Sequence, residues 1–434
     1  MRQNYELTFE QQKSLDLFNS KLDGKFITHL NACVHCGLCG DSCHYYLATK
    51  DERFIPGRKV DLISSIYRRY HTLGGRLFPK FFGARDYNEE TISEMVDILY
   101  GACTMCGRCS THCSIGVDVA FLVRTSRMML EEMKLVPKGL QSTVDAAIQT
   151  GNNMGIPRQE FVDTLEWLEE DLQMEVEDDN ASIQLDQKDK NIMYTLNPRE
   201  PKFFPLSISA MAKIYYAAKE SWTISTNTYD VTNYSYYSGD EAGARELTQR
   251  LHAEMKKLNA KTLVLAECGH GSRAIRWEGP NWIKSEYPFN VITAVELIAE
   301  YIRTGRIKLD KSLNKELITL HDPCNLVRAG GVIEEQRFIM KHAASNFIEM
   351  TPNRRDNYCC GGGGGQLSMS EYNERRVASG KIKAEQIRAT GAKIVATPCH
   401  NCIDQLMGLN QEYKLGVEIK TIGEIVADAL VIDM

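Results

Sequence analysis

Two cysteine motifs with the same spacing, CxxCxxCxxxC, constrain this chain more than any other feature. The eight cysteines are Cys33, Cys36, Cys39, Cys43, Cys103, Cys106, Cys109 and Cys113. Three thiolates at three-residue steps wrap one face of an iron–sulfur cube, and the fourth cysteine ligates the other cube in the two-cluster arrangement. The motifs therefore predict two cubane 4Fe-4S clusters, one bound by Cys33, Cys36, Cys39 and Cys113 and the other by Cys103, Cys106, Cys109 and Cys43.

Zinc is the alternative metal for such cysteines. Tetrahedral zinc sites use paired CxxC units, and a third cysteine within seven residues would crowd one ion. The spacing therefore favours iron–sulfur. Clusters of this kind usually carry proline after the fourth cysteine, where this chain has His44 and Ser114. We expect that departure to tune the potential without removing a ligand.

Composition limits the class and location of the protein. A length of 434 residues suggests about three domains. The net formal charge is -6, no basic run reaches five residues, and we expect no nucleic-acid partner. The first residues lack the charged start and apolar stretch of a secretory signal, so we expect a cytoplasmic protein with reduced cysteines. We also find no apolar stretch of about 18 residues, so any peripheral attachment to the membrane should go through a partner.

The chain divides into five predicted segments. They are an N-terminal amphipathic helix at 1–30, a helical ferredoxin-like domain with both 4Fe-4S motifs at 31–135, a helical connector with an acidic linker at 136–191, and two lobes at 192–310 and 311–434. The acidic run from 163 to 179 could dock a basic partner, but a solvated helix face and linker is the simpler explanation.

Short apolar runs alternate with helical segments after residue 191, which indicates an α/β fold. The expected strands are 262–267, 290–293, 316–322, 347–350 and 393–398. The region also repeats itself: TLVLAECGHG at 262–271 corresponds to KIVATPCHNC at 393–402, and TAVELIAEYI at 293–302 to TIGEIVADAL at 421–430. Matching order at nearly matching intervals predicts a tandem duplication.

The second lobe holds five cysteines in three loops. The pattern C-x34-CC-x38-CxxC comprises Cys324, Cys359, Cys360, Cys399 and Cys402. Five thiols are one too many for a cube, so a cluster that uses them should have opened edges and bridging thiolates. The glycines at 361–365 would let the backbone approach such a cluster and present N–H groups to it. A phosphate loop is the alternative, but no GK[ST] follows.

This arrangement resembles the cysteine-rich CCG domain of the heterodisulfide reductase catalytic subunit. From about residue 30 onward, the chain is similar to fused heterodisulfide-reductase-like iron–sulfur proteins, including the cytoplasmic iron–sulfur subunits of membrane electron-transfer complexes in sulfate reducers. The resemblance implies a noncubane 4Fe-4S cluster on the five cysteines of the second lobe. It also implies a membrane b-type cytochrome partner, within a complex of further subunits, that exchanges electrons with the quinone pool.

The first lobe departs from that pattern. At the positions of four second-lobe cysteines it has Arg199, Ser235, Tyr236 and Gly271, and only Cys268 matches a cysteine, Cys399. One thiol cannot hold a cluster, so we expect one noncubane cluster, as in the subfamily associated with dissimilatory sulfite reduction. Cys268 is either a small buried residue or a catalytic thiol that contacts substrate sulfur.

Several polar residues near these cysteines have two interpretations. His270 is either a structural histidine or a proton donor, and Arg273 flanks the same loop. His321, His400 and Arg328 could supply protons or anion contacts, but hydrogen bonding that supports the loops is the simpler expectation.

These inferences predict an oxidoreductase subunit. It would relay electrons between a membrane quinone or cytochrome b partner and a disulfide or trisulfide substrate, whose carrier could be a small protein. One alternative is a pure electron-transfer subunit, as in the iron–sulfur partners of glycolate and lactate dehydrogenases. The other is a structural or regulatory iron–sulfur protein, which three clusters disfavour.

Overall fold

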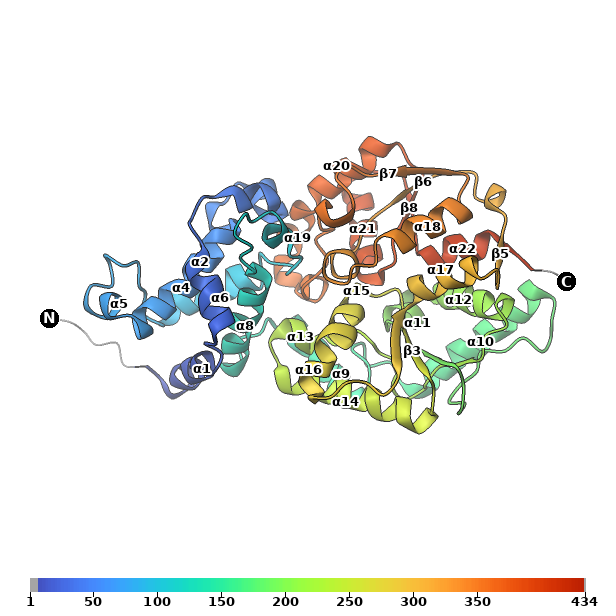
Figure 1. The fold of residues 1–434 in the computed structure, drawn as a ribbon, viewed down its shortest axis with the longest axis horizontal. Helices are drawn as coiled ribbons and strands as arrows, with labels where there is room; N and C mark the ends of the chain where they lie inside the picture. The colour runs from blue at the N-terminus through green and yellow to red at the C-terminus, as the bar shows by residue number, and fades with distance from the viewer. Residues whose placement is uncertain (1–6, 433–434) are drawn as a thin grey trace. The chain divides into compact units, whose positions relative to one another are not determined.

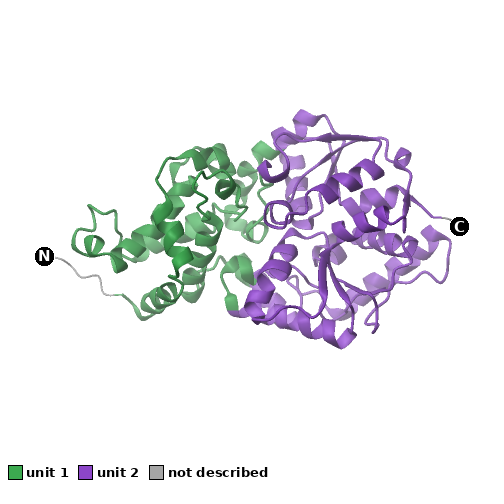
Figure 2. Cartoon of the chain, in the orientation of Figure 1, with its two compact units in different colours: residues 1–141, 235–241, 358–383 green, residues 142–234, 242–357, 384–434 purple. Residues whose placement is uncertain are grey.

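The computed structural model describes residues 7–432, which divide into two compact units (Figures 1 and 2). Unit 1 comprises residues 1–141, 235–241 and 358–383, and unit 2 comprises residues 142–234, 242–357 and 384–434. Two segments of unit 1 are thus inserted into the sequence of unit 2. The first insertion follows Tyr234 and the second follows Asn357.

Unit 1 is helical. Its helices are α1 (Phe9–Ser20), α2 (Gly24–Ala32), α3 (His44–Thr49), α4 (Pro56–His71), α5 (Leu73–Leu77), α6 (Glu89–Leu99), α7 (Arg108–Thr111), α8 (Val119–Glu132), α13 (Ser235–Ser238) and α19 (Asn373–Ser379). Helix α9 (Lys138–Thr150) and two later helices, α14 (Glu241–Leu258) and α20 (Lys381–Thr390), run across unit boundaries.

The predicted single helix over 1–30 is wrong in the described part. Helix α1 ends at Ser20, and α2 starts again at Gly24 because the Asp23 side chain caps it by accepting from the Phe26 N–H at 2.8 Å. Residues 1–6 of that prediction lie outside the described residues.

A buried arginine on α8 holds the segments of unit 1 together. The Arg127 guanidinium is fully buried and makes five donor contacts with backbone carbonyls, which belong to Leu99, Cys103, Tyr237 and Gly364. A guanidinium has five N–H donors, and here all of them are used. This one side chain therefore ties the second cysteine motif to both inserted segments.

Unit 2 is α/β and contains two four-stranded parallel sheets within residues 142–432. The first has the order β2-β1-β3-β4 and the second the order β7-β6-β8-β9. The strands are β1 (Ile192–Tyr194), β2 (Trp222–Thr223), β3 (Thr262–Leu265), β4 (Asn290–Thr293), β6 (Leu317–Leu320), β7 (Asn346–Glu349), β8 (Ile394–Ala396) and β9 (Glu418–Lys420). A two-stranded antiparallel sheet joins β5 (Lys308–Leu309) to β10 (Leu430–Val431).

Helices cover these sheets. They are α10 (Arg158–Val176), α11 (Arg199–Phe203), α12 (Pro205–Ala217), α15 (Gly269–Gly271), α16 (Gly279–Ile283), α17 (Ala294–Arg303), α18 (Glu334–Ala343), α21 (His400–Tyr413) and α22 (Ile422–Asp428). Helix α22 packs against α12, α17 and α18 (Figure 1), and one hydrophobic cluster includes Leu263 of the first sheet and Ile318 of the second. The two sheets therefore share a core.

The same local signal starts the helix after the last strand of each sheet. Thr293 caps α17 and Thr421 caps α22, and each forms a capping box with the glutamate three residues later. The short strands place loops at the carboxyl edge of each sheet, where ligands bind in open parallel sheets.

No helix in residues 7–432 is long and apolar enough to cross a membrane.

Candidate iron–sulfur and sulfur-reactive sites

The two cysteine motifs of unit 1 have the same backbone turn. The residue before the second cysteine and the glycine after it have positive φ in both motifs: 56° and 78° at His35 and Gly37, and 53° and 72° at Met105 and Gly107. Glycine is suited to such a conformation because it has no Cβ. The CxxCG sequence therefore forms the same tight turn in both motifs.

These turns gather the eight cysteines around two cavities. Cys33, Cys36, Cys39 and Cys113 line the first, and Cys43, Cys103, Cys106 and Cys109 line the second. Cys109 and Val119 line both, so the cavities are adjacent. Each cavity thus combines three cysteines of one motif with the fourth cysteine of the other.

The donors at these cavities suit iron–sulfur clusters. All fourteen cysteines of the chain, which all lie in the described part, are free thiols. The Gly57 N–H at the start of α4 donates to Cys39 Sγ at 3.2 Å, at the helix end where the backbone dipole favours negative charge. Four thiolates around one cavity, with N–H groups directed at sulfur, are what a cubane cluster needs.

A buried cation lies beside the second cavity. Lys59 lines it, is 2% exposed and donates to the carbonyl of Ala102. Burial lowers the pKa of Lys59, but the negative charge of Cys103 and other nearby thiolates outweighs burial and the net pKa is raised. Lys59 therefore stays charged and offsets part of the negative charge of the thiolates.

His44 occupies the usual proline position and lies against two cysteines of unit 1. One ring nitrogen of His44, Cys106 Sγ and Cys359 Sγ all lie within 4.8 Å of one another. The Nε2 atom is 3.3 Å from Thr104 Oγ1, while Nδ1 is buried without a hydrogen bond. The sequence predicted only a change of potential at this position and gave no sign of the contact with Cys359.

The adjacent cysteines Cys359 and Cys360 are buried in unit 1 and receive backbone N–H groups from the glycine run. Gly361 N donates to Cys359 Sγ at 3.4 Å and Gly362 N to Cys360 Sγ at 3.5 Å. A Cβ on Gly364 would lie 2.8 Å from the Thr104 backbone. The glycines therefore serve both the thiols and the close packing of this segment against the second motif.

The other predicted second-lobe cysteines, Cys324, Cys399 and Cys402, are buried in unit 2. Cys324 follows β6 and Cys399 follows β8, so both lie at the carboxyl edge of the second sheet. Cys268 follows β3 of the first sheet at the same interval of three residues by which Cys399 follows β8.

The loops that carry Cys268 and Cys399 contact each other. Gly269 N of the first loop donates to Cys399 Sγ at 3.4 Å, and His400 N of the second donates to the Glu267 carbonyl at 3.0 Å. Cys268 Sγ itself accepts from Gly271 N at 3.4 Å and from Asn197 Nδ2 at 3.5 Å. Cys268 is therefore buried in the loop that contacts Cys399, and polar N–H groups surround its sulfur.

The positions without cysteine in the first lobe are filled by other groups. Arg199 forms an ion pair with Asp404 on α21. A Cβ on Gly271 would lie 2.6 Å from Val231, so a side chain at that position would collide with its neighbour. The first lobe therefore lacks both the thiols and the space for a ligand at 271.

The histidines in these loops hold neighbouring groups. His400 interacts with the Glu267 carbonyl at 3.2 Å and with Ser207 Oγ at 3.1 Å, and His270 pairs with Asn401. Burial lowers the pKa of His270 to about 3 and that of His400 to about 4. Both are neutral at pH 7, which agrees with a supporting role for each.

Three more predicted residues have different surroundings. Arg328 donates to the carbonyls of Asn357 and Arg355, at 2.8 and 3.2 Å, so its guanidinium holds the loop before Tyr358. Arg273 pairs with Glu278 at 2.6 Å. His321 is buried, and its backbone N–H donates to the Ala396 carbonyl at 2.9 Å.

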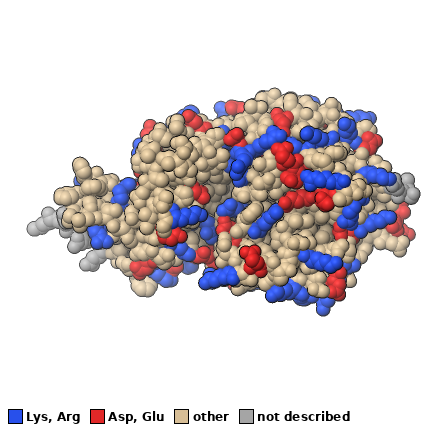
Figure 3. Space-filling view, viewed as in Figure 1, with Lys and Arg blue, Asp and Glu red and all other residues tan. Residues whose placement is uncertain are grey.

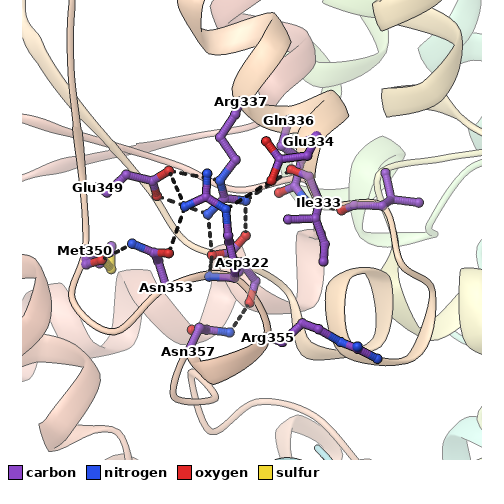
Figure 4. Close-up of polar contacts among 12 residues, drawn as sticks. Asp322, Ile333, Glu334, Gln336, Arg337, Glu349, Met350, Asn353, Arg355 and Asn357 are labelled. Carbon is purple, nitrogen blue, oxygen red and sulfur yellow. Dashed lines mark hydrogen bonds and ion pairs between the residues drawn. The ribbon is translucent and has the colours of Figure 1, made fainter.

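Sequence reasoning missed a buried charge network that supports the Cys324 loop (Figure 4). Arg337 of α18 donates to Asp322 Oδ2 at 2.7 Å and to Glu349 Oε1 at 3.0 Å. Asp322 also accepts from Arg354 N at 2.7 Å, and its carbonyl accepts from Asn357 Nδ2 at 2.6 Å. Asp322 stands two residues before Cys324, so the network fixes both that loop and the loop before Cys359. The spacing of Asp322 and Arg337 in the sequence gives no signal of the pair.

Comparison with known proteins identifies both cysteine regions. Residues 29–117 match a family described as a 4Fe-4S dicluster domain, and residues 318–407 match a cysteine-rich domain, the CCG family. The 4Fe-4S prediction for the first two motifs is therefore confirmed over the zinc alternative.

Similar proteins extend over nearly the whole chain. The "Hdr-like menaquinol oxidoreductase iron-sulfur subunit 2" of Archaeoglobus fulgidus is 28% identical, with 98% of this chain and 82% of the relative covered. A subunit of the dihydromethanophenazine:CoB--CoM heterodisulfide reductase of Methanosarcina barkeri is 28% identical, with 93% of this chain and 95% of the relative covered. The "EtfAB:quinone oxidoreductase" of Syntrophomonas wolfei is 22% identical over 88% of this chain and 55% of its own length.

Proposed function

Since this chain is a heterodisulfide-reductase-like iron–sulfur oxidoreductase, we propose that it is the subunit that carries electrons between a membrane quinone or cytochrome b partner and a disulfide or trisulfide substrate. When bound, two cubane clusters would supply one-electron transfer and one noncubane 4Fe-4S cluster would supply iron to the substrate sulfur. The names of the relatives support this proposal, since one is a menaquinol oxidoreductase subunit and another belongs to a heterodisulfide reductase.

Each cubane cluster is assigned three cysteines of one motif and the fourth cysteine of the other motif. We assign one cluster to Cys33, Cys36, Cys39 and Cys113 and the other to Cys103, Cys106, Cys109 and Cys43. The lining of the two adjacent cavities supports this pairing, because each holds one of these sets.

The five cysteines Cys324, Cys359, Cys360, Cys399 and Cys402 are the proposed noncubane ligands. The match of residues 318–407 to the cysteine-rich domain supports this set. One such cluster, not two, is proposed, because the first lobe has Arg199 in place of one ligand and no room for a side chain at Gly271. The matching strand orders of the two sheets support the duplication from which the lobes derive.

The contact of His44 with Cys106 and Cys359 is the observation that carries the electron-transfer proposal. Cys106 is an assigned ligand of the second cubane and Cys359 an assigned ligand of the noncubane cluster. The buried ring between them provides a short path from the relay to the reacting centre. Lys59, which lines the second cavity, keeps a positive charge next to the second cubane.

Reduction of a disulfide takes two electrons and two protons and yields two thiols. Electrons would arrive singly through the cubanes, so the terminal site must hold the substrate between two transfers. Cys268, whose loop contacts Cys399, is the proposed thiol that contacts substrate sulfur.

The competing function is a pure relay that serves a separate flavin-dependent dehydrogenase of the glycolate or lactate type. The similarity to the relative named as an EtfAB:quinone oxidoreductase favours this alternative. A relay needs no iron that is open to substrate, whereas a disulfide reductase does.

A thiol titration separates the two functions. Anaerobically purified, oxidised protein is mixed with candidate thiols, and the paramagnetic signal is followed in the wild type, in Cys268→Ala and in Cys359→Ser. Disulfide chemistry predicts a new signal with thiol in the wild type, a weaker one in Cys268→Ala and none in Cys359→Ser. If no thiol changes the signal while reduced protein still passes electrons to an artificial acceptor at full rate, the relay function is correct.

A further inference from the structure

A cluster of exposed apolar side chains lies between the two cysteine motifs, in and just after α5. They are Leu73, Leu77, Phe78, Phe81 and Phe82, which we call the apolar tip. Leu73 is 74% exposed, Phe78 62% and Phe81 86%. Single exposed apolar residues are ordinary, but five large ones within ten residues mark an interaction surface.

The apolar tip has a defined shape. Thr72 caps α5 by accepting from Gly75 N at 3.1 Å. The ring of Phe82 packs so closely on Gly74 that a Cβ there would lie 2.7 Å from it, and Phe81 and Phe82 form an edge-to-face pair. Gly74, Gly75 and Pro79 are poor helix formers, yet α5 forms over Leu73–Leu77.

Four backbone N–H groups of the apolar tip donate to carbonyls within it. Phe78 N donates to Gly74 O at 2.8 Å, Phe81 N and Phe82 N donate to Phe78 O at 3.1 and 3.2 Å, and Ala84 N donates to Pro79 O at 2.8 Å. Backbone N–H groups without partners are costly in lipid, and these groups already have partners.

Positive charge surrounds the apolar tip. Residues 62–85 contain five cations, at Arg68, Arg69, Arg76, Lys80 and Arg85, and no aspartate or glutamate. Two of these cations pair with carboxylates just outside this range, Arg69 with Asp86 and Arg85 with Glu94. Within the described residues, neither Arg76 nor Lys80 forms an ion pair. In Figure 3, the surface at the position of α5 in Figure 1 consists of basic residues, in blue, and other residues, in tan.

We propose that the apolar tip inserts into the headgroup region of an anionic lipid bilayer, with Arg76 and Lys80 at the lipid phosphates. Bulky apolar side chains next to cations are the features of a peripheral membrane anchor. Arg76 and Lys80, the two cations of the tip without an ion pair among the described residues, match a surface of uniform negative charge better than the mixed charges of a protein interface. This direct contact is additional to attachment through a partner subunit.

Vesicle flotation of the full, cluster-loaded chain tests this proposal. The probes are phosphatidylcholine vesicles with and without phosphatidylglycerol, at low and high salt. The wild type should float with the anionic vesicles and lose binding at high salt. Phe78→Ser/Phe81→Ser should bind at least about tenfold more weakly, and Lys80→Glu should bind several-fold more weakly, since both apolar burial and charge contribute.

The matched control is Trp167→Ser/Met174→Ser, which removes two large apolar side chains that are 50% and 72% exposed on α10. It should float as the wild type does. Iron content and the visible spectrum of every variant report on folding and are independent of lipid binding.

Three outcomes would overturn the proposal. They are a wild type that floats with neither vesicle, an apolar-tip variant that floats as well as the wild type, and equal losses in the variant and its control. If the wild type ignores vesicles but Phe78→Ser/Phe81→Ser alone fails to bind the purified membrane subunit, the tip contacts protein instead of lipid.

Discussion

The two four-stranded sheets of unit 2 have the same strand order but different chemistry at their carboxyl edges. After β3 and after β8, a cysteine follows the strand at the same interval, and each sheet ends in a helix started by a threonine capping box. Beyond that, the segments after the strands of the second sheet carry Cys324, Cys399 and, in the first turn of α21, Cys402, whereas those of the first sheet carry Cys268 alone.

The first sheet therefore forms the same strand order without the cluster ligands. Where the first lobe lacks thiols, other residues take their places: Arg199 pairs with Asp404, and Gly271 has no room for a side chain. The two loops also exchange contacts, since Gly269 N reaches Cys399 and His400 N reaches the Glu267 carbonyl. The first lobe therefore acts as a support that covers one side of the Cys399 loop.

Replacing each of the two equivalent cysteines, Cys268 and Cys399, with serine tests this difference between the lobes, and the effect on iron content should be large. Three 4Fe-4S clusters hold about 12 irons per chain, so Cys399→Ser should reduce the content to about 8 while Cys268→Ser leaves about 12. Iron and acid-labile sulfide assays on anaerobically purified protein measure both variants. Equal iron in the two variants would show that the lobes do not differ in ligation as proposed.

The ion pair of Arg337 and the ion pair of Arg199 should contribute differently to the free energy of unfolding. Arg337→Met leaves Asp322 buried without its cation and should lower the free energy of unfolding by about 3–5 kcal/mol. Arg199→Met leaves Asp404, which is 18% exposed and can still reach water, and should cost about 1–2 kcal/mol.

Urea unfolding under anaerobic conditions, followed by near-ultraviolet circular dichroism, compares these two variants. Arg337→Lys keeps a positive charge but loses the planar guanidinium. Its free energy of unfolding should lie between those of the wild type and Arg337→Met. A larger loss in Arg199→Met than in Arg337→Met would contradict the assignment of the second lobe's network as the stronger support.

Sequence patterns predicted the long elements of this structure well. Helix α10 falls within the helical connector expected before the acidic linker, and β3, β4, β6, β7 and β8 fall on the predicted apolar runs. In β3, β6 and β8 these apolar runs are also buried. The strands missed were β1, β2, β5, β9 and β10, which have two or three residues each and exist because neighbouring strands pair with them.

The parts that sequence could not predict depend on distant partners. Arg127 looks like an ordinary helix residue in VRTSRMML, but its guanidinium binds carbonyls from three segments that are far apart in the sequence. The membership of 235–241 and 358–383 in unit 1 is equally invisible, because no local pattern records which unit an inserted segment joins. The cysteine motifs could be predicted because the spacing of neighbouring cysteines indicates the type of cluster. The contact of His44 with Cys359 could not be predicted, because the two residues are 315 positions apart in the sequence.

The last prediction concerns Glu267, which stands where the second lobe has Pro398. Its carboxyl group is buried and accepts from Ile422 N at 2.9 Å and Gly423 N at 3.1 Å, but burial raises its pKa to about 8. The folded state therefore holds a proton that the unfolded state releases above its ordinary pKa of 4.5. The resulting stabilisation is fully present below pH 4.5, declines as the pH rises, and is lost above about pH 8.

Glu267→Gln should remove this dependence. The free energy of unfolding of the wild type should fall between pH 5 and pH 8 by up to about 1.4 kcal/mol per pH unit more steeply than that of the variant. Burial also raises the pKa of Glu200, so the slope that remains in Glu267→Gln should diminish further in Glu200→Gln/Glu267→Gln. Glu246→Gln, on the exposed side of α14, should retain the wild-type slope. Parallel slopes in the wild type and Glu267→Gln would mean that Glu267 is ionised in the fold, and that its two N–H contacts with α22 outweigh its burial.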